Sequence, residues 1–142
     1  MTEKLLICDE WEFSKQPFGT EYSEDFCWEK IDIPHDWLIY DAKNLYETST
    51  GWYRRKYFYQ KSDEKIFIRF DGVYMDSSVY VNEKKAGEWK YGYSTFEFDI
   101  TELLCEGENL ITVRVNYQSP NSRWYSGAGI FRKVQIIKRP PV

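Results

Sequence analysis

The stretch Leu110-Ile111-Thr112-Val113-Arg114-Val115-Asn116-Tyr117 alternates strictly between apolar or aromatic residues and polar residues. Successive side chains of a β-strand point to opposite faces, so residues 111, 113, 115 and 117 would share one face. The stretch Lys65-Ile66-Phe67-Ile68-Arg69-Phe70-Asp71 shows the same period, with Ile66, Ile68 and Phe70 on one side. This pattern is typical of antiparallel strands that bury one face and expose the other.

Working outward, the same reasoning predicts further short strands and very little helix. The turn residues Asn82-Glu83-Lys84-Lys85 follow an alternating strand in which Val79 and Val81 point inward. Residues 100–105 alone look helical, as a short turn capped by Asp99 or Thr101 and ended by Gly107. We therefore expect an all-β fold: a jelly-roll β-sandwich of two antiparallel sheets with one short helical turn. The additional strands are expected at residues 11–15, 29–33, 51–60, 77–81, 86–90, 94–99 and 129–138.

Size and charge exclude several classes of protein. The chain has 142 residues, whereas a (β/α)₈ barrel needs about 250. The net charge of −4 argues against non-specific binding to nucleic acid or to an anionic membrane, since both need a basic field. The sequence contains neither an apolar run long enough to cross a bilayer nor a signal peptide. We expect a cytoplasmic protein with no nucleic-acid or membrane partner.

Cysteine and aromatic usage narrow the choice further. Cys8, Cys27 and Cys105 are odd in number and lack metal-ligand spacing, and His35 is the one histidine. This predicts reduced, partly buried thiols and no zinc site or other metal. Phe, Trp and Tyr make up 19% of the chain. Two explanations stay open for this excess: the core of a β-sandwich, or a flat platform for a carbohydrate or another ligand.

The chain is predicted to form a single domain over residues 1–142. No internal repeat or low-complexity tract interrupts it. The tail 138–142 contains Pro140 and Pro141, which end strand pairing and favour an extended connection. We expect this tail to be the start of a linker in a larger protein.

The richest candidate for a site is the segment between residues 116 and 132. Pro120, Gly127 and Gly129 interrupt the strand pattern, which predicts a long loop from Tyr117 to Ala128. Such a loop would carry Arg123, Trp124 and Tyr125 together. The guanidinium offers a fork of donors for hydroxyl groups, and Trp or Tyr stacks on a sugar ring. The alternative is that Trp124 and Tyr125 only cover the edge of the sandwich.

The sequence Pro34-His35-Asp36-Trp37 provides a second candidate. A lone histidine such as His35 is more often a structural hydrogen-bonding residue than a catalyst. Asp36 could contact a sugar or cap the following turn, and Glu47 lies in a polar, loop-like stretch. Gly51-Trp52-Tyr53-Arg54-Arg55 reads as the start of a strand. Its arginines are expected to pair with Asp or Glu across the sheet, or with further domains, rather than to bind phosphate. The many carboxylates form no isolated pair in a setting that marks it as catalytic.

Several stretches, in their order and spacing, resemble the N-terminal sugar-binding domain of glycoside hydrolase family 2. The resemblance runs from about Trp11 to Ile137. The stretches that carry it are Pro34-His35-Asp36-Trp37, Thr50-Gly51-Trp52-Tyr53-Arg54-Arg55, Phe70-Asp71-Gly72-Val73, Val79-Tyr80-Val81-Asn82, Phe96-Glu97-Phe98-Asp99-Ile100-Thr101, Gly107-Glu108-Asn109 and Asn121-Ser122-Arg123-Trp124-Tyr125-Ser126-Gly127-Ala128-Gly129-Ile130-Phe131-Arg132.

This resemblance implies a galactose-binding-domain-like jelly roll that precedes an immunoglobulin-like domain and a catalytic (β/α)₈ barrel in enzymes of the β-galactosidase, β-glucuronidase and β-mannosidase family. It further implies that the catalytic glutamates lie on the barrel. This chain alone would then be inactive, hold no cofactor and bind a terminal β-linked sugar weakly. Its full-length parent would hydrolyse terminal β-glycosides in carbohydrate metabolism and could form a homo-oligomer.

The resemblance also implies roles for individual residues. Asn121 and Arg123 would hydrogen-bond the sugar or orient the acids of the barrel, with Trp124 and Tyr125 as walls. Several members of the family carry an aspartate near the position of Arg123, which in some helps to hold sodium, so the arginine disfavours a metal here. Two alternatives remain: a free-standing carbohydrate-binding module, and a structural or protein-interaction sandwich.

Overall fold

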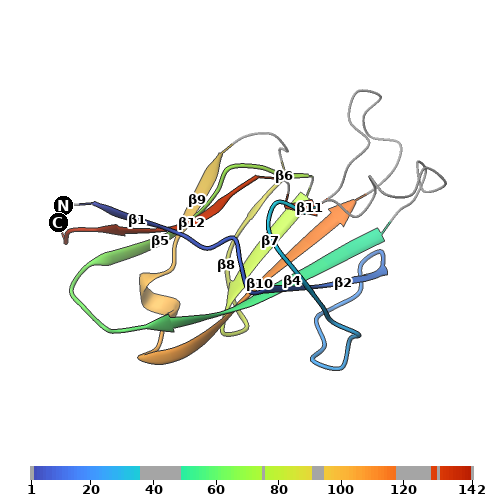
Figure 1. The fold of residues 1–142 in the computed structure, drawn as a ribbon, viewed down its shortest axis with the longest axis horizontal. Helices are drawn as coiled ribbons and strands as arrows, with labels where there is room; N and C mark the ends of the chain where they lie inside the picture. Colours follow the sequence, from blue (N-terminus) through green and yellow to red (C-terminus); the bar gives the residue numbers. More distant parts are fainter. Residues whose placement is uncertain are drawn as a thin grey trace.

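The computed structural model describes residues 2–35, 49–74, 76–90, 95–117, 129–130 and 132–141. These residues form two main antiparallel sheets and one short strand pair (Figure 1). The four-stranded sheet has the order β1 (Glu3–Leu6), β12 (Val134–Arg139), β5 (Lys65–Phe70), β9 (Phe96–Asp99). The six-stranded sheet has the order β3 (Glu29–Ile31), β2 (Trp11–Pro17), β4 (Ser49–Tyr59), β10 (Gly107–Tyr117), β7 (Asp76–Val81), β8 (Lys84–Trp89). The short pair is β6 (Val73–Tyr74) with β11 (Gly129–Ile130).

The core lies between the two main sheets. Ile66, Ile68 and Phe70 of β5 are fully buried. Ile111, Val113 and Val115 of β10 are fully buried as well, and all six belong to one hydrophobic cluster. The alternation therefore identified the inward face of both strands correctly, and the predicted all-β jelly-roll sandwich is confirmed.

The strand β1 was not predicted. All four of its residues are exposed, so it carries no alternation of apolar and polar residues. It forms because its backbone pairs with β12, with Glu3 opposite Lys138. Backbone pairing of an edge strand leaves no pattern in the side chains, which is why this strand cannot be read from the alternation.

The predicted turns are present, with two corrections: the helical turn has Ile100 at its N-cap and no side-chain cap, rather than a cap from Asp99 or Thr101, and it does not end at Gly107. Asn82 and Glu83 both have positive φ values, 52° and 69°, as a two-residue hairpin between β7 and β8 requires. The helical turn is the 3-10 turn η2 (Thr101–Leu103), and Asp99 Oδ1 accepts hydrogen bonds from the backbone N–H and hydroxyl of Thr101. The turn ends at Leu103, so the expectation that Gly107 ends it was wrong. Gly107 instead begins β10 at a φ of 97°.

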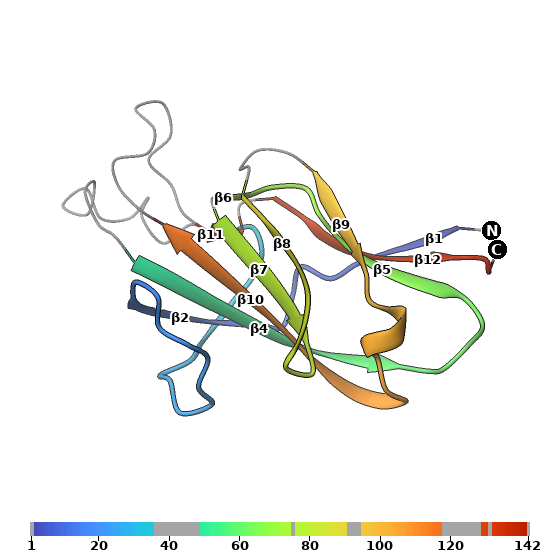
Figure 2. The same ribbon diagram turned by 180° about the vertical axis from the view of Figure 1, so that it is seen from behind.

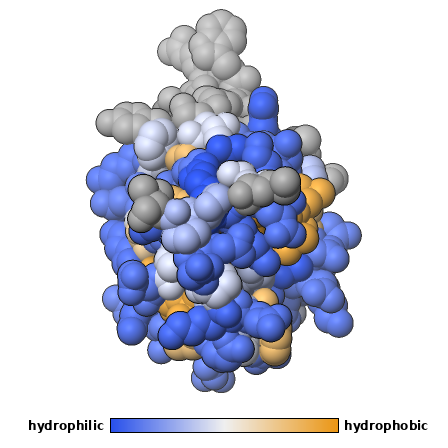
Figure 3. All heavy atoms as spheres, turned by 90° about the vertical axis from the view of Figure 1, so that its left-hand side faces the viewer, coloured by the Kyte–Doolittle hydropathy of each residue, from blue (hydrophilic) through white to orange (hydrophobic). Residues whose placement is uncertain are grey.

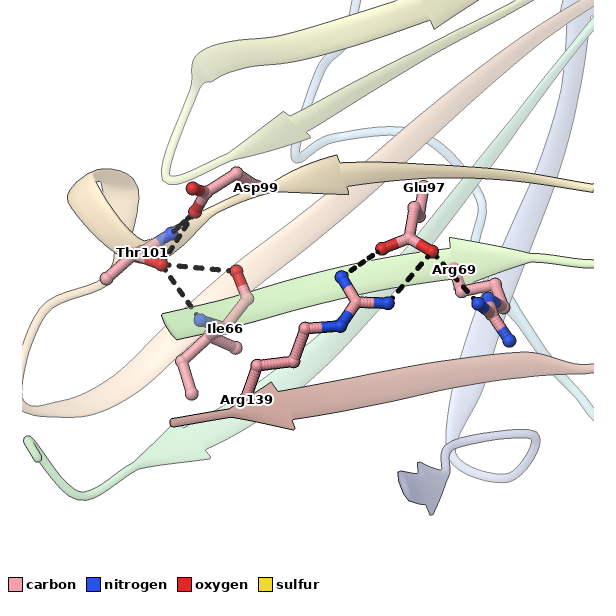
Figure 4. Close-up of polar contacts among 6 residues, drawn as sticks. All are labelled: Ile66, Arg69, Glu97, Asp99, Thr101 and Arg139. Carbon is pink, nitrogen blue, oxygen red and sulfur yellow. Dashed lines mark hydrogen bonds and ion pairs between the residues drawn. The ribbon is translucent and has the colours of Figure 1, made fainter. Parts of the chain in front are cut away.

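The Glu97 carboxylate links three strands on the outer face of the four-stranded sheet through hydrogen bonds to two arginines (Figure 4). Glu97 on β9 accepts hydrogen bonds from Arg139 Nη1 on β12 at 2.6 Å and from Arg69 Nη2 on β5 at 3.0 Å. The hydrogen bond from Arg139 is the main reason that the pKa of Glu97 lies below its ordinary value, and Arg69 adds to the effect against the opposing effect of burial.

The chain termini and the paired ends of β4 and β10 lie at opposite ends of the sandwich. Both chain termini lie at one end, beside the paired strands β1 and β12, as Figures 1 and 2 show. The paired ends of β4 and β10 at Ser49 and Tyr117 lie at the other end. The surface around the termini is mostly hydrophilic with separate hydrophobic patches (Figure 3).

The three cysteines agree only in part with the prediction. Cys8 is half-buried, whereas Cys27 and Cys105 are exposed, and all three are free thiols. The expectation of partly buried thiols therefore holds for Cys8 alone. Within the described ranges, no helix has the length and apolar character needed to cross a membrane.

Candidate functional site

All the predicted site residues lie outside the residues that the structure describes. They belong to two segments, 36–48 and 118–128. The structure does describe where both segments leave the sandwich: at His35, Ser49, Tyr117 and Gly129, which we call the anchor residues. The predicted site residues concerned are Asp36, Glu47, Asn121, Arg123, Trp124 and Tyr125.

Ser49 and Tyr117 are held side by side by the two longest strands. They form the last residue pair of the β4–β10 ladder. Next to them, the Thr50 hydroxyl donates to Asn116 Oδ1 at 2.6 Å and accepts the backbone N–H of Gly19 at 2.8 Å. Thr50 is fully buried, so these bonds satisfy polar groups that water does not reach. The first segment therefore ends beside the point where the second begins.

His35 and Gly129 are held together at the other pair of ends. The backbone N–H of His35 donates to the carbonyl of Ile130 at 2.7 Å, and its Nδ1 lies 2.7 Å from the Tyr53 hydroxyl. The imidazole also packs against the Phe13 ring, with centroids 4.5 Å apart. These contacts agree with a structural role for the histidine.

A side chain at position 129 would disrupt this junction. Gly129 has a φ of +131°, and a Cβ built there would lie 2.5 Å from the Tyr53 hydroxyl and 2.6 Å from the His35 carbonyl oxygen. A residue with a Cβ rarely adopts this backbone conformation. The junction thus requires glycine at position 129. This junction holds His35, the residue before the first segment, close to Gly129, the residue after the second segment. The paired ends of β4 and β10 lie at the end of the sandwich opposite the termini, and β11, which begins at Gly129, lies between them and the middle of the molecule (Figures 1 and 2).

A second region lies on the outer face of the six-stranded sheet. The segment 18–28, between β2 and β3, folds over this face (Figure 2). Trp52 donates from its indole nitrogen to the Thr20 carbonyl at 2.8 Å, and the Tyr22 ring lies 5.6 Å from the Trp52 ring. The Trp28 ring lies 4.1 Å from the guanidinium carbon of Arg54. Trp52 is only 2% exposed as a result, although it points away from the core.

The arginines of β4 pair as the sequence predicted. Arg54 Nε lies 2.9 Å from Glu12 Oε1 on the neighbouring strand, and Arg55 Nη2 lies 3.0 Å from Asp9 Oδ1. Burial alone would lower the pKa of Arg54, but the hydrogen bonds that Arg54 donates to the Tyr22 hydroxyl and the Glu12 carboxylate outweigh it and raise this pKa above its ordinary value. These charges are therefore already compensated within the domain.

Two hollows flank Tyr22 on this outer face. The larger, of about 840 Å³, contains the compensated charges of Arg54, Arg55 and Glu12. The smaller, of about 280 Å³, lies between segment 18–28 and strands β7 and β10. Its lining consists of Glu21, Tyr22, Trp52, Tyr80, Glu83, Thr112 and Arg114.

Sequence reasoning did not single out the smaller hollow. A signal was present, because Trp52, Tyr80 and Arg114 occupy outward positions of strands whose inward positions are apolar. Aromatic residues at outward positions need a cover or a ligand. Nothing in the alternation itself, however, indicates that segment 18–28 folds over them. Within the described ranges, no group of metal-ligating side chains comes together.

Comparison with known proteins places this geometry in a family. The family model described as "Glycosyl hydrolases family 2, sugar binding domain" matches residues 10–140. The beta-galactosidase BoGH2A of Bacteroides ovatus is 43% identical over 129 residues, which is 81% of this chain and 15% of that protein. A beta-glucuronidase of Bacteroides fragilis is 32% identical over 120 residues, 80% of this chain and 16% of that protein.

Solved structures agree with the sequence relatives. A glycosyl hydrolase family 2 member from Bacteroides cellulosilyticus superposes with a TM-score of 0.83 at 31% identity, over 96% of this chain and 21% of that one. A calcium-binding mutant of Bacteroides uniformis beta-glucuronidase 2 superposes with a TM-score of 0.84 at 29% identity. The superposition covers 99% of this chain and 18% of that one. The chain thus spans about one sixth of the length of the curated relatives named above. It belongs to the sugar-binding domain family of glycosyl hydrolase family 2.

Proposed function

We propose that this chain is the non-catalytic domain of a family 2 β-glycosidase and completes the sugar subsite of that enzyme. The two segments 36–48 and 118–128 carry the contacts. Asn121 and Arg123 donate hydrogen bonds to a terminal β-linked sugar or to the acids that act on it. Trp124 and Tyr125 form apolar walls, and Asp36 and Glu47 contact the sugar from the first segment.

The observation that carries this proposal is that the ends of the two segments meet in pairs on the sandwich. Ser49 pairs with Tyr117, and the His35 backbone bonds to Ile130, which follows Gly129. Segments that leave from and return to adjacent positions on a rigid sheet are well placed to build one site. The anchor pair of Ser49 and Tyr117, at the paired ends of β4 and β10, lies away from both termini (Figure 1).

The proposal assigns hydrolysis to another part of the polypeptide. Retaining glycoside hydrolysis needs two carboxyl groups about 5 Å apart on either side of the sugar. In the proposed enzyme these groups come from a barrel domain that a chain of 142 residues cannot contain. The isolated chain is therefore expected to release no product from nitrophenyl β-galactosides or β-glucuronides.

A substitution in the full-length enzyme tests the proposal. Arg123→Ala removes a charged donor to the sugar, so kcat/KM should fall by about 10- to 100-fold, the equivalent of one hydrogen bond to a charged group. Lys133→Ala is the control, because Lys133 is exposed and only pairs loosely with Asp71 at 3.6 Å. An unchanged kcat/KM for Arg123→Ala would remove this segment from the active site.

A titration of the isolated chain separates this role from that of an independent carbohydrate-binding module. A subsite shared between domains binds galactose, lactose or glucuronate only at millimolar concentrations or above. Saturable amide shifts at the anchor residues with any of these sugars well below millimolar would contradict the shared subsite and favour the independent module.

A further inference from the structure

The smaller hollow on the outer face of the six-stranded sheet contains polar groups that no protein group uses. Among the described residues, Glu21, Glu83 and the hydroxyls of Tyr80 and Thr112 make no ion pair or hydrogen bond through their side chains. The larger hollow differs, because its arginines pair with carboxylates of the same domain. The smaller hollow therefore offers unused donors and acceptors to a ligand.

Arg114 is the most unusual of these groups. Its Nε is buried and has no hydrogen-bond partner among the residues that the structure describes. Its one bond in the described structure is a long one, 3.4 Å from Nη2 to the Ser78 hydroxyl. Its guanidinium carbon lies 5.9 Å from the Trp52 ring centroid. This guanidinium lies near an aromatic ring and makes no ion pair within the described residues, although Glu88 on β8 is close enough to interact with it electrostatically, so its donor fork can serve a ligand.

Aromatic rings form the apolar part of the same hollow. Tyr22 and Tyr80, both half-buried, pack against Trp52, with ring centroids 5.6 and 6.0 Å from it. The buried Trp52 fixes their positions. The exposed parts of the two tyrosines can therefore pack on the face of a ring-shaped ligand.

The combination of positive and negative side chains in the smaller hollow indicates which class of ligand it can bind. A simple anion would use Arg114 and be repelled by Glu21 and Glu83, whereas a cation would use the carboxylates and be repelled by Arg114. A ring with several hydroxyl groups uses them all, because each hydroxyl both donates and accepts. The hollow of about 280 Å³ is at the small end of the roughly 300–1,000 Å³ typical of ligand sites, which favours a single ring.

We infer that this hollow is an accessory binding site for one neutral pyranose ring. It lies on the outer face of the sheet, and none of its lining residues belongs to the segments 36–48 and 118–128. In this site Arg114 donates to ring hydroxyls, Glu21 and Glu83 accept from them, and Tyr22 and Tyr80 cover the faces of the ring. The site would hold a saccharide on the domain independently of the catalytic subsite, so it stands even if the proposed subsite does not.

Chemical-shift titration of the ¹⁵N-labelled chain tests the inference. Methyl β-galactoside and methyl β-glucoside should shift the amides of Tyr80, Thr112 and Arg114 in a saturable way, and sodium acetate should not. Arg114→Gln keeps much of the side-chain volume but removes the fork, and should weaken this binding about tenfold or more. Lys56→Gln is the matched control, since it removes an exposed cation of the same sheet outside this hollow.

The other outcomes contradict the inference. Equal binding by wild type and Arg114→Gln would do so, as would saturable shifts with acetate or the absence of shifts with both glycosides. If Arg114→Gln does not fold, Tyr80→Leu replaces it and should weaken binding several-fold by removing a ring face. Arg123→Ala distinguishes the two proposals, because it should leave the shifts at Tyr80 and Arg114 intact.

Discussion

The two faces of the six-stranded sheet are built from the same strands and are buried in different ways. On the inner face, Ile111, Val113 and Val115 of β10 pack into the core with no polar partner to satisfy. On the outer face, Thr112 is also buried and Arg114 is half-buried, but charges and aromatic rings surround them. Burial of a residue therefore does not by itself show that the residue belongs to the hydrophobic core. The outer face is covered by a segment of the chain and retains chemistry that a ligand can use.

The largest expected effect comes from the inner face. Trp11 is fully buried and its indole nitrogen donates to the Ile7 carbonyl at 2.7 Å. Trp11→Ala should lower the free energy of unfolding by about 3–5 kcal/mol, because it leaves a large cavity. Urea unfolding followed by circular dichroism measures this. Phe58→Ala is the control, since Phe58 is 77% exposed and should change stability by less than about 0.5 kcal/mol.

The next effect tests the junction between the anchor residues. Gly129→Ala combines an unfavourable φ with close approach to Tyr53 and His35, so it should cost about 2–4 kcal/mol. Gly19→Ala has a positive φ of 85° but open space around the new Cβ, and should cost only about 1–2 kcal/mol. Equal losses in thermal or urea unfolding would show that the junction is not tightly packed.

A smaller loss of stability is expected from one of two buried threonines on the outer face, and almost none from the other. Thr50→Val leaves the Gly19 N–H and Asn116 Oδ1 without their partner and should cost about 1–3 kcal/mol. Thr112 is 5% exposed, and its hydroxyl has no hydrogen-bond partner among the described residues. Thr112→Val should therefore change stability by less than about 0.5 kcal/mol. The reverse order would contradict the role of Thr50 at the base of the two segments.

The smallest effect concerns the other sheet and depends on pH. The pKa of Glu97 is lowered in the folded protein, chiefly by Arg139. Its ionised form therefore stabilises the fold above the ordinary glutamate pKa of about 4.3, and this contribution is lost as the pH falls below that value. Glu97→Gln should weaken the decline of stability in acid by at most about 1 kcal/mol, since the pair is partly exposed. Glu108→Gln, at the long 3.9 Å pair with Lys56, should leave the decline unchanged.

The alternation of β5 and β10 was sufficient to predict the sandwich, because residues with period two can bury only one face each. It could not predict β1, whose formation depends on backbone pairing with β12. It also could not show that Thr50 and Asn116 bond to each other across β4 and β10, since register is a property of the assembled sheet. The predicted site residues are tied to sequence resemblance, and the structure adds the place from which their segments extend.

The most direct test of the account is to map where a terminal β-galactoside contacts the isolated, ¹⁵N-labelled chain. The proposed subsite predicts weak, millimolar binding with amide shifts at the anchor residues His35, Ser49, Tyr117 and Gly129. Shifts confined to β1 and β12 beside the termini, or none at the anchor residues at saturating sugar, would contradict it.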